Sequence, residues 1–232
     1  MIMDPIIRLI IVTVLSFLAG SLPTAVIISR RFFGFDIRER GSGNMGSTNA
    51  FRVLGVKWGL TVQIIDILKG VLAVTVIAYL FVGEQIPFPN YTPFQDITLV
   101  RVICGIAAVM GHIWSPWVGW KGGKGINTAV GMLIGVAPVE VAIIFSIFLI
   151  TVGISGYVSL GSILAAMALP TTMAVRYNIF HVDIEGYHTI VFMLIGLSLL
   201  VIYAHRQNIQ RLLAGNENKF ENLRLVNIFK KK

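Results

Sequence analysis

The sequence has few charged residues and almost no cysteine. Only 13% of its 232 residues are Asp, Glu, Lys or Arg, whereas a soluble domain carries about 25%. A water-soluble fold with so few charges would lack the polar surface that keeps it in solution. Cys104 is the single cysteine, so a disulfide scaffold is excluded. We interpret Cys104 as a small apolar residue inside a membrane span.

Acidic residues are scarcer than basic ones, with 11 Asp and Glu against 19 Lys and Arg, and the net charge is +8. The sequence shows no nucleic-acid-binding motif, and in a membrane protein an excess of Lys and Arg usually indicates topology. Hydrophobic residues make up 56% of the chain, which excludes disorder. Together these features predict an all-α, polytopic integral membrane protein.

Long apolar stretches support this class. Each is near the length of about 20 residues that a helix needs to cross a bilayer. The stretches cover residues 6–28, 58–82, 97–113, 126–150, 158–175 and 187–204. The first has no small-residue cleavage site, so we interpret it as a retained helix and not as a signal peptide.

The basic residues lie mainly between these stretches, in 30–57, 114–125 and the tail 205–232, whereas 83–96 has no Lys or Arg. The positive-inside rule therefore predicts that the three basic segments are cytoplasmic and that the N-terminus lies outside. We treat residues 1–232 as a single membrane domain.

The predicted topology requires that one apolar stretch is divided into two membrane helices. Five stretches separate the first basic loop from the basic tail, and an odd number would place the tail outside. Pro138 interrupts 126–150, and two short helices, about 126–137 and 139–153, each thinner than a bilayer core, restore the parity. This gives about seven transmembrane helices with a cytoplasmic C-terminus. The alternative is one long tilted helix, with the tail held inside by another device.

Residues 38–52 combine glycines, neutral hydrogen-bonding side chains and arginines. Glycine lets backbone amides approach a ligand closely, and arginine recognises anions with a planar fork. This inventory indicates a phosphate site; a solvated basic loop would explain the arginines but not the neutral side chains. The candidate residues are Gly41, Ser42, Gly43, Asn44, Gly46, Thr48, Asn49 and Arg52.

A second glycine-rich segment comprises Lys121, Gly122, Gly123, Lys124 and Gly125. It is typical of an anion-binding loop, and the amides of the helix that follows would add to the site. A flexible basic turn is the alternative. The segment is not a Walker A loop, because glycine and not serine or threonine follows the second lysine.

Two further groups are polar. Ser159 and Ser162 lie three residues apart at the start of a span, a spacing that by itself favours helix packing. Together with the other polar segments, we include both serines among the phosphate-binding candidates. His205 and Asn208 share a helical face where the last span ends, and Glu217 follows in the tail. Histidine can donate, accept or carry charge near neutral pH, so this pair is a candidate for chemistry.

Asp66 and Lys69 lie three residues apart inside the second apolar stretch. A charge there is costly and is usually paired or functional, so the two residues either support the structure or contribute to the site. His112 lies at the end of the third stretch, where we expect a hydrogen bond to the second glycine-rich segment. The sequence has no metal-binding motif, and we expect neither a metal nor a cofactor.

These polar segments resemble the motifs of the bacterial acyl-phosphate:glycerol-3-phosphate acyltransferase family (PlsY). Arg38–Arg52 matches R-x-x-G-S-G-N-x-G-A-T-N-x-x-R, with Ser47 at the alanine position. Gly111–Gly125 resembles G-H-x-x-P-x-x-x-x-F-K-G-G-K-G, with the proline one place later at Pro116. His205–Glu217 matches H-R-x-N-I-x-R-L-x-x-G-x-E. The resemblance extends over nearly the whole chain.

The resemblance implies a seven-helix enzyme of the bacterial inner membrane, with its site on the cytoplasmic side. Such an enzyme transfers a fatty acyl group from acyl-phosphate to the 1-hydroxyl of glycerol 3-phosphate, giving lysophosphatidate and phosphate for phospholipid biosynthesis. Its partners would be these two substrates and the lipid bilayer, with no nucleic acid and no obligate protein partner.

Acyl-phosphate is already activated, so the enzyme mainly has to position the substrates and neutralise charge. We therefore expect direct attack without an acyl-enzyme. The expected catalytic residues are Ser42, Arg52, Lys124, His205 and Asn208. The base is either His205 or a phosphate oxygen of the substrate.

A transporter or channel for a phosphorylated solute is the alternative function. It would use the same anion loops, with Asp66 and Lys69 lining a path. The absence of an internal repeat and the concentration of polar residues on one predicted side count against it.

Overall fold

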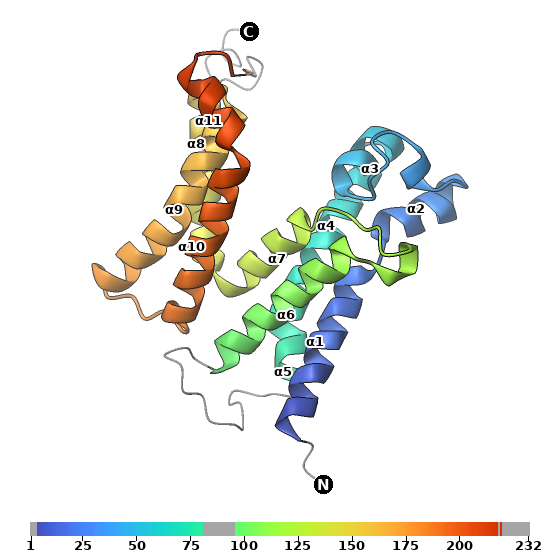
Figure 1. Cartoon of the computed structure of the whole chain (residues 1–232), viewed down its shortest axis with the longest axis horizontal. Helices are drawn as coiled ribbons and strands as arrows, with labels where there is room; N and C mark the ends of the chain where they lie inside the picture. Colours follow the sequence, from blue (N-terminus) through green and yellow to red (C-terminus); the bar gives the residue numbers. More distant parts are fainter. Residues whose placement is uncertain (1–3, 81–95, 218, 220–232) are drawn as a thin grey trace. The chain divides into compact units, whose positions relative to one another are not determined.

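The computed structural model describes residues 4–80, 96–217 and 219, and every regular element in this part of the chain is helical. The chain divides into two compact units, Met1–Val136 and Ala137–Lys232. The first unit contains α1 to α7 and the second contains α8 to α11 (Figure 1). The predicted all-α class is confirmed.

The first predicted span is not one continuous helix. Helix α1 covers Pro5–Ser21 and α2 covers Thr24–Phe33. The break falls at Pro23, because proline lacks an N–H and disfavours a helical conformation at the preceding Leu22. The expectation of a single helix over 6–28 is therefore wrong at this point, and the chain changes direction between the two helices (Figure 1).

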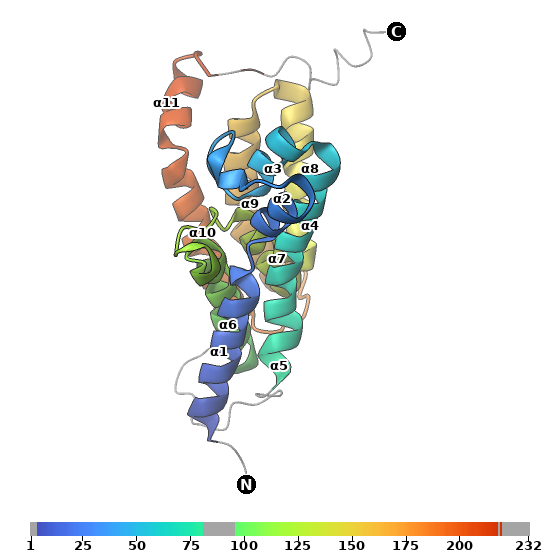
Figure 2. The ribbon, with the colours of Figure 1, turned by 90° about the vertical axis from the view of Figure 1, so that its right-hand side faces the viewer.

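The first unit contains three further helical segments of more than ten residues. Val56–Leu72 forms α4, which continues through a π-helical turn at Ala73–Ile77 into α5 (Ala78–Leu80). Asp96–Ile113 forms α6, and Ile126–Val136 forms α7. Helix α1 packs along α6, and α4 packs along α7 (Figure 2).

Glycine permits the close packing of α4 on α7. A Cβ atom at Gly70 would lie 2.1 Å from the Thr128 carbonyl oxygen, and one at Gly131 would lie 1.9 Å from the Ile67 carbonyl oxygen. No side chain fits at such distances, so the two backbones meet directly, as is common between membrane helices.

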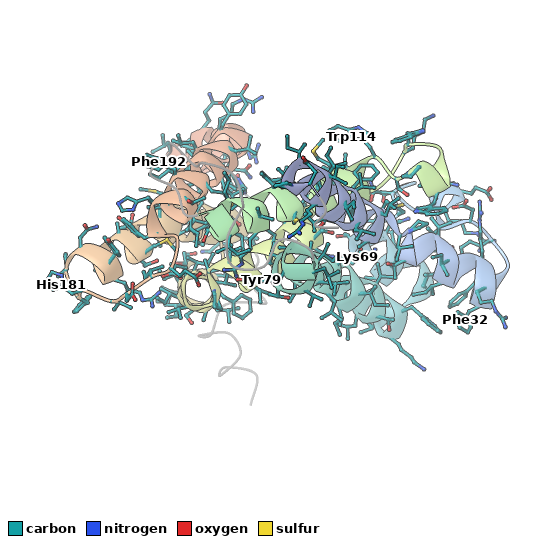
Figure 3. The ribbon with its side chains drawn as sticks, turned by 90° about the horizontal axis from the view of Figure 1, so that it is seen from below. Phe32, Lys69, Tyr79, Trp114, His181 and Phe192 are labelled. Carbon is teal, nitrogen blue, oxygen red and sulfur yellow. The ribbon has the colours of Figure 1, made fainter. Side chains whose placement is uncertain are left out.

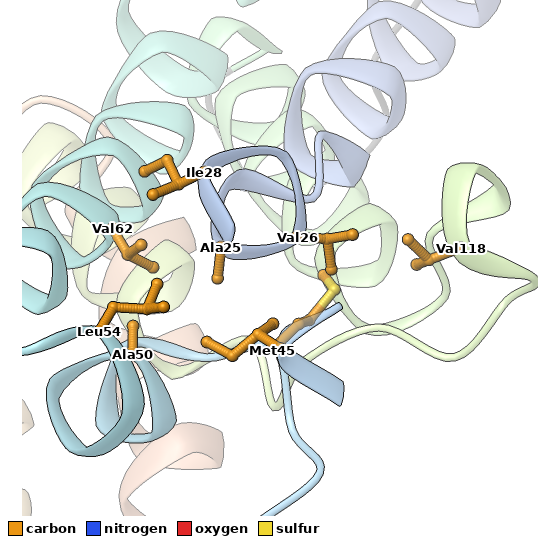
Figure 4. Close-up of a cluster of buried hydrophobic side chains, with 9 residues drawn as sticks. Ala25, Val26, Ile28, Met45, Ala50, Leu54, Val62 and Val118 are labelled. Carbon is orange, nitrogen blue, oxygen red and sulfur yellow. The ribbon is translucent and has the colours of Figure 1, made fainter. Parts of the chain in front are cut away.

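A buried apolar cluster joins α2 and α4 to the polar segment between them (Figure 4). Its members are Ala25, Val26, Ile28, Ile37, Met45, Ala50, Leu54, Val62 and Val118. Because Val118 also belongs to the cluster, its packing fixes both the segment between α2 and α4 and the segment after α6 against the helices.

The predicted break at Pro138 is confirmed. Helix α7 ends at Val136 and α8 covers Pro138–Ser155, with the proline in its first turn. Helix α8 has 18 residues, or about 27 Å at 1.5 Å per residue, and α7 has 11 residues, or about 17 Å. Both halves are thus shorter than a bilayer core of about 30 Å, as expected, and α7 is much the shorter of the two.

In the second unit, α8 packs against α9 (Val158–Asn178), and α9 packs against α10 (Tyr187–Ala204). The buried Glu140 of α8 pairs with Arg176 of α9. Ser198 of α10 donates a hydrogen bond of 2.6 Å to the Ala166 carbonyl oxygen of α9. The short helix α11 covers Arg206–Leu213.

Five helical segments of the described chain are long and apolar enough to cross a membrane. They are Pro5–Phe33, Val56–Leu80, Ile97–Val118, Pro138–Ser155 and Val158–Asn178. Ile126–Val136 and Tyr187–Tyr203 are apolar but shorter. Large apolar side chains such as Phe192 point outward, whereas the charged Lys69 lies among the helices (Figure 3). This distribution is typical of an integral membrane protein.

Candidate active site

Asn49 organises the first glycine-rich segment. It is almost fully buried in α3 (Ser47–Leu54), a helix that the sequence reading treated as loop. Its Oδ1 accepts a hydrogen bond of 2.8 Å from the Ser42 amide. Its Nδ2 donates to three carbonyl oxygens, those of Ile37, Arg40 and Asn44, at 3.2, 3.1 and 2.9 Å. The side chain is thus occupied by the loop, and we correct its expected role from phosphate binding to support.

The loop conformation that Asn49 holds requires a glycine at position 41. Its φ is +63°, and a Cβ atom there would lie 2.3 Å from Asn49 Oδ1. The amides of Ser42, Gly43 and Gly46 all bond to acceptors within the loop. These three amides are therefore not available to a phosphate, contrary to the expectation from the glycine content.

An ion-pair group fixes the start of this segment. Asp36 Oδ2 lies 2.8 Å from Arg30 and 2.7 Å from Arg38. The hydrogen bond from Arg38 holds the pKa of the Asp36 carboxyl well below its usual range, and the same bond raises the pKa of Arg38. Arg38 also donates a hydrogen bond of 2.9 Å to the Val118 carbonyl oxygen, which ties the two polar segments together.

The second glycine-rich segment folds back on the end of α6. The amides of Gly122 and Gly123 donate to the carbonyl oxygens of Ile113 and His112, at 2.9 and 3.0 Å. These glycine amides are thus also occupied, and the expected anion cradle does not form from them. The expected link from His112 to this segment exists, but through its backbone carbonyl.

A pocket of about 330 Å³ lies in the first unit. Its lining includes the first turns of α3 and α7 and the side chains of Ser42, Thr48, Arg52 and Lys124. The structure thus brings together residues that are far apart in the sequence and that we predicted as a phosphate site. Lys121, Gly41, Gly43, Gly122 and Gly123 are not part of its lining.

The pocket is electropositive for two reasons. The first amides of α3 and α7 have no acceptor within their own helices, and helix N-termini attract anions. Arg52 and Lys124 are exposed and make no hydrogen bond or ion pair with the described residues. Asn127 Nδ2 donates a hydrogen bond of 2.9 Å to Ser47 Oγ, which joins the two N-termini.

Asp66 and His112 also line this pocket, and both are buried. Asp66 Oδ1 lies 2.6 Å from Lys69 Nζ and accepts a hydrogen bond of 3.2 Å from Thr24 Oγ1. Lys69 also donates a hydrogen bond of 2.6 Å to the Leu22 carbonyl oxygen. The Asp66–Lys69 pair therefore supports the break between α1 and α2 and contributes to the pocket at the same time.

The second unit carries the other predicted residues. Its pocket, of about 540 Å³, is lined by Ser159, Ser162, His205, Asn208 and Glu217, among others. His205 Nδ1 lies 2.8 Å from the Val201 carbonyl oxygen. A carbonyl oxygen only accepts, so Nδ1 carries the proton and Nε2 is the nitrogen left for a ligand.

Glu217 returns to α11 through a turn at Gly215, whose φ is +71°. Its carboxylate accepts hydrogen bonds from Asn208 Nδ2 at 2.8 Å and from Arg211 Nε at 2.7 Å. These two bonds, together with a hydrogen bond from Ser159, lower the pKa of Glu217 to about 2. Asn208 is thus held by Glu217, which explains the spacing of the tail motif.

The two serines of α9 differ. Ser162 Oγ donates a hydrogen bond of 3.0 Å to the Val158 carbonyl oxygen within its own helix. Ser159 is buried, and its hydroxyl donates to the carboxylate of Glu217. Ser159 therefore links α9 to the tail, whereas Ser162 bonds within its own helix.

Sequence reasoning missed Thr24 and Asn127. Asn127 is the second residue after the second glycine-rich segment, in the first turn of α7, and that position was a usable signal. Thr24 reaches Asp66 across 42 residues, and no local pattern indicates such a contact. The part of the chain described here holds no group of three or more His, Cys, Asp or Glu side chains that could bind a metal ion.

Comparison with known proteins places this architecture in a family. The sequence profile of the glycerol-3-phosphate acyltransferase family matches residues 10–215. Glycerol-3-phosphate acyltransferase of Chlorobium phaeobacteroides (strain BS1) is 44% identical over 230 residues, covering 91% of this chain and 96% of its own. That of Chlorobaculum tepidum is 44% identical over 223 residues, covering 90% and 94%.

Two crystal structures of PlsY (YgiH), an integral membrane glycerol 3-phosphate acyltransferase, are also similar. The glycerol 3-phosphate form has a TM-score of 0.64 and 33% identity, covering 93% of this chain and 96% of its own. The lysophosphatidic acid form has a TM-score of 0.64 and 31% identity, covering 94% and 98%. The chain therefore belongs to the glycerol-3-phosphate acyltransferase family.

Proposed function

We propose that this protein transfers a fatty acyl group from acyl-phosphate to the 1-hydroxyl of glycerol 3-phosphate, giving lysophosphatidate and phosphate. The observation that carries the proposal is the pocket of the first unit, where two helix N-termini meet Arg52 and Lys124. Both substrates present a phosphate, the group that such a site binds. The family's solved relatives include a glycerol 3-phosphate form and a lysophosphatidic acid form.

The proposed reaction is a direct displacement. The hydroxyl oxygen of glycerol 3-phosphate attacks the acyl carbonyl carbon and forms the ester bond. The bond between that carbon and the phosphate oxygen breaks, and phosphate leaves with the electron pair. Ser42, Arg52 and Lys124 hold phosphate groups and neutralise the charge of the leaving group, which is the main contribution that an activated donor requires.

The hydroxyl proton needs an acceptor. His205 Nε2 is suited to this role, because Nδ1 is held by the Val201 carbonyl oxygen and the ring orientation is thereby fixed. A phosphate oxygen of the substrate is the alternative acceptor. Asn208, oriented by Glu217, is proposed to act beside His205.

The proposal assigns roles to Lys124 of the first unit and to His205 of the second. Lys124→Ala and His205→Ala should each reduce kcat/KM strongly. If the two side chains depend on each other in the reaction, the double variant should be much less impaired than the product of the single effects predicts. Strictly multiplicative effects would show that the two side chains contribute independently.

We further propose seven membrane helices in the bacterial inner membrane, with the N-terminus outside and the site cytoplasmic. In a Cys104→Ala background, a cysteine at Asn216 should be shielded from an impermeant thiol reagent added to intact cells. A cysteine at Phe180, which is exposed, should be labelled. The reverse pattern would invert the proposed topology.

The activity is tested with purified protein in detergent. Phosphate should be released from acyl-phosphate only when glycerol 3-phosphate is present, and lysophosphatidate should form in equal amount. Acyl-CoA should not replace acyl-phosphate. Transport of glycerol 3-phosphate into vesicles without product formation would instead support the transporter alternative.

The absence of an acyl-enzyme is tested separately. Ser42 lines the pocket of the first unit and Ser159 that of the second, so these two serines are the candidate nucleophiles. Incubation with labelled acyl-phosphate alone should leave neither labelled after denaturation, and initial-rate plots should intersect. Stoichiometric label on a serine, with parallel plots, would overturn direct attack.

A further inference from the structure

Asp66 and His112 form a buried polar end of the first unit's pocket that the proposed mechanism leaves without a role. Both side chains line the pocket, yet they are only 1% and 3% exposed as residues. His112 Nδ1 is buried and has no hydrogen-bond partner in the described part of the chain. An unsatisfied buried nitrogen is costly and calls for an explanation.

The distance between the Asp66 and His112 side chains explains how the His112 nitrogen could be satisfied by a ligand. His112 Nδ1 lies 3.9 Å from Asp66 Oδ1, which is too far for a hydrogen bond. It is close enough for one oxygen atom to bond to both groups. The hydrogen bonds that Asp66 makes with described residues all end on Oδ1, so Oδ2 also has unused capacity.

The carboxylate of Asp66 and the imidazole of His112 could both form a hydrogen bond with one hydroxyl group placed between them. A hydroxyl donates one hydrogen bond, which a carboxylate accepts, and it accepts one, which an imidazole N–H donates. Lys69, 2.6 Å from Asp66 Oδ1, compensates the negative charge.

The same pocket carries the unpaired cations Arg52 and Lys124. A ligand that satisfies all four side chains therefore has a phosphate at one end and a hydroxyl near it. We propose that Asp66 and His112 bind the 2-hydroxyl of glycerol 3-phosphate, the hydroxyl that does not react, and so select a phosphorylated diol over a simple phosphorylated alcohol. This inference rests on the proposed function.

The test compares two acceptors. Glycerol 3-phosphate carries the 2-hydroxyl; 3-hydroxypropyl phosphate lacks it but keeps the phosphate and the hydroxyl that is acylated. The wild-type protein should prefer glycerol 3-phosphate by about 10- to 100-fold in kcat/KM, the range for one hydrogen bond to a charged group. Equal kcat/KM values for the two acceptors would overturn the inference and leave the proposed function intact.

The variant Asp66→Asn keeps the size of the side chain and removes its charge. It should lower kcat/KM for glycerol 3-phosphate while leaving 3-hydroxypropyl phosphate little affected, so that the preference falls to about threefold or less. If the uncompensated Lys69 prevents folding, Asp66→Asn/Lys69→Gln removes both charges and supplies the same ratio. His112→Phe should reduce the preference independently.

Matched controls separate recognition from general damage. Glu140→Gln makes the corresponding change in another buried, ion-paired carboxylate that lies outside the pocket. Thr98→Val removes another buried polar group of α6. Both controls should keep the wild-type preference. A folded Asp66 variant that loses activity toward both acceptors equally would show a structural role and contradict the inference. Absence of all activity in the wild type would instead count against the proposed function.

Discussion

The two units differ in whether the basic side chains beside their pockets are already paired with acids. In the first unit, the acids Asp36 and Asp66 are paired with Arg30, Arg38 and Lys69, and none of these pairs includes Arg52 or Lys124. In the second unit, Glu217 pairs with Arg211 beside His205. A high density of basic residues therefore does not by itself identify a phosphate site. The informative feature is a cation in a pocket whose neighbouring acids are already paired elsewhere.

The two units also hold their polar segments differently. Asn49 supports the first segment with a neutral amide that bonds to four backbone groups. In the second unit, the Glu217 carboxylate holds α11 and the tail together by accepting hydrogen bonds from two side chains. The first arrangement is insensitive to pH, whereas the second depends on the ionisation of one carboxyl group.

The largest expected effect concerns the unpaired cations. Lys124→Ala should reduce kcat/KM by about 2–4 kcal/mol, because it removes a charge that stabilises the leaving phosphate. Lys124→Arg should restore little activity, since the guanidinium is larger and planar. Steady-state kinetics with Lys57→Ala as the control tests this; Lys57 is exposed and outside the pocket. Wild-type activity in Lys124→Ala would remove the proposed distinction between the two units.

Asn49→Ala should affect stability. It removes the partner of the Ser42 amide and of the Asn44 carbonyl oxygen and two further bonds to loop carbonyls, so we expect a loss of about 2–3 kcal/mol in the free energy of unfolding. Asn44→Ala removes one loop hydrogen bond, to the Gly46 amide, and should cost about 1 kcal/mol. Chemical unfolding in detergent measures both values. Equal losses would show that Asn49 does not organise the segment.

A smaller effect is expected for Ser42→Ala. The Ser42 amide would still bond to Asn49, so the loop should keep its conformation while one neutral donor to phosphate is lost. The KM for glycerol 3-phosphate should rise about 5- to 10-fold, with kcat little changed. Initial-rate measurements decide this. A large loss of kcat at unchanged KM would indicate a nucleophile instead.

The smallest effect concerns pH in the second unit. The pKa of Glu217 is lowered from 4.5 to about 2 in the folded protein. Its contribution to stability is therefore fully present above pH 4.5 and is lost as the pH falls from 4.5 towards 2. Amide hydrogen exchange of α11 should accelerate over this range in the wild type and less in Glu217→Gln. The same acceleration in both proteins would exclude Glu217 as the cause.

The predicted apolar stretches are helical in the structure because an apolar run of this length has one stable form in a bilayer, the helix. The break at Pro138 was predictable since proline cannot continue a helix from the preceding turn. The equivalent break at Pro23 was missed, although the same rule applies, because the apolar run continues through it. Helix α3 was missed because only eight residues form it, between two glycines.

Local patterns also misassigned some polar groups. The glycine-rich segments indicated free backbone amides, yet the amides of Gly43, Gly46, Gly122 and Gly123 bond to neighbouring carbonyl or side-chain oxygens. Composition reports which donors exist but not which acceptors lie beside them. Helix termini supply the unpaired amides of the pocket instead.

The sequence by itself determined the class of this protein, its helical segments and the residue types for phosphate chemistry, because hydropathy, proline and charge act locally along the chain. Only the tertiary structure decided which cations stay unpaired. Thr24 and Asp66, 42 residues apart, and Ser47 and Asn127, 80 residues apart, meet through helix packing. Pairing is a property of distance in space, so the division between supporting charges and available charges appears only after the helices have packed.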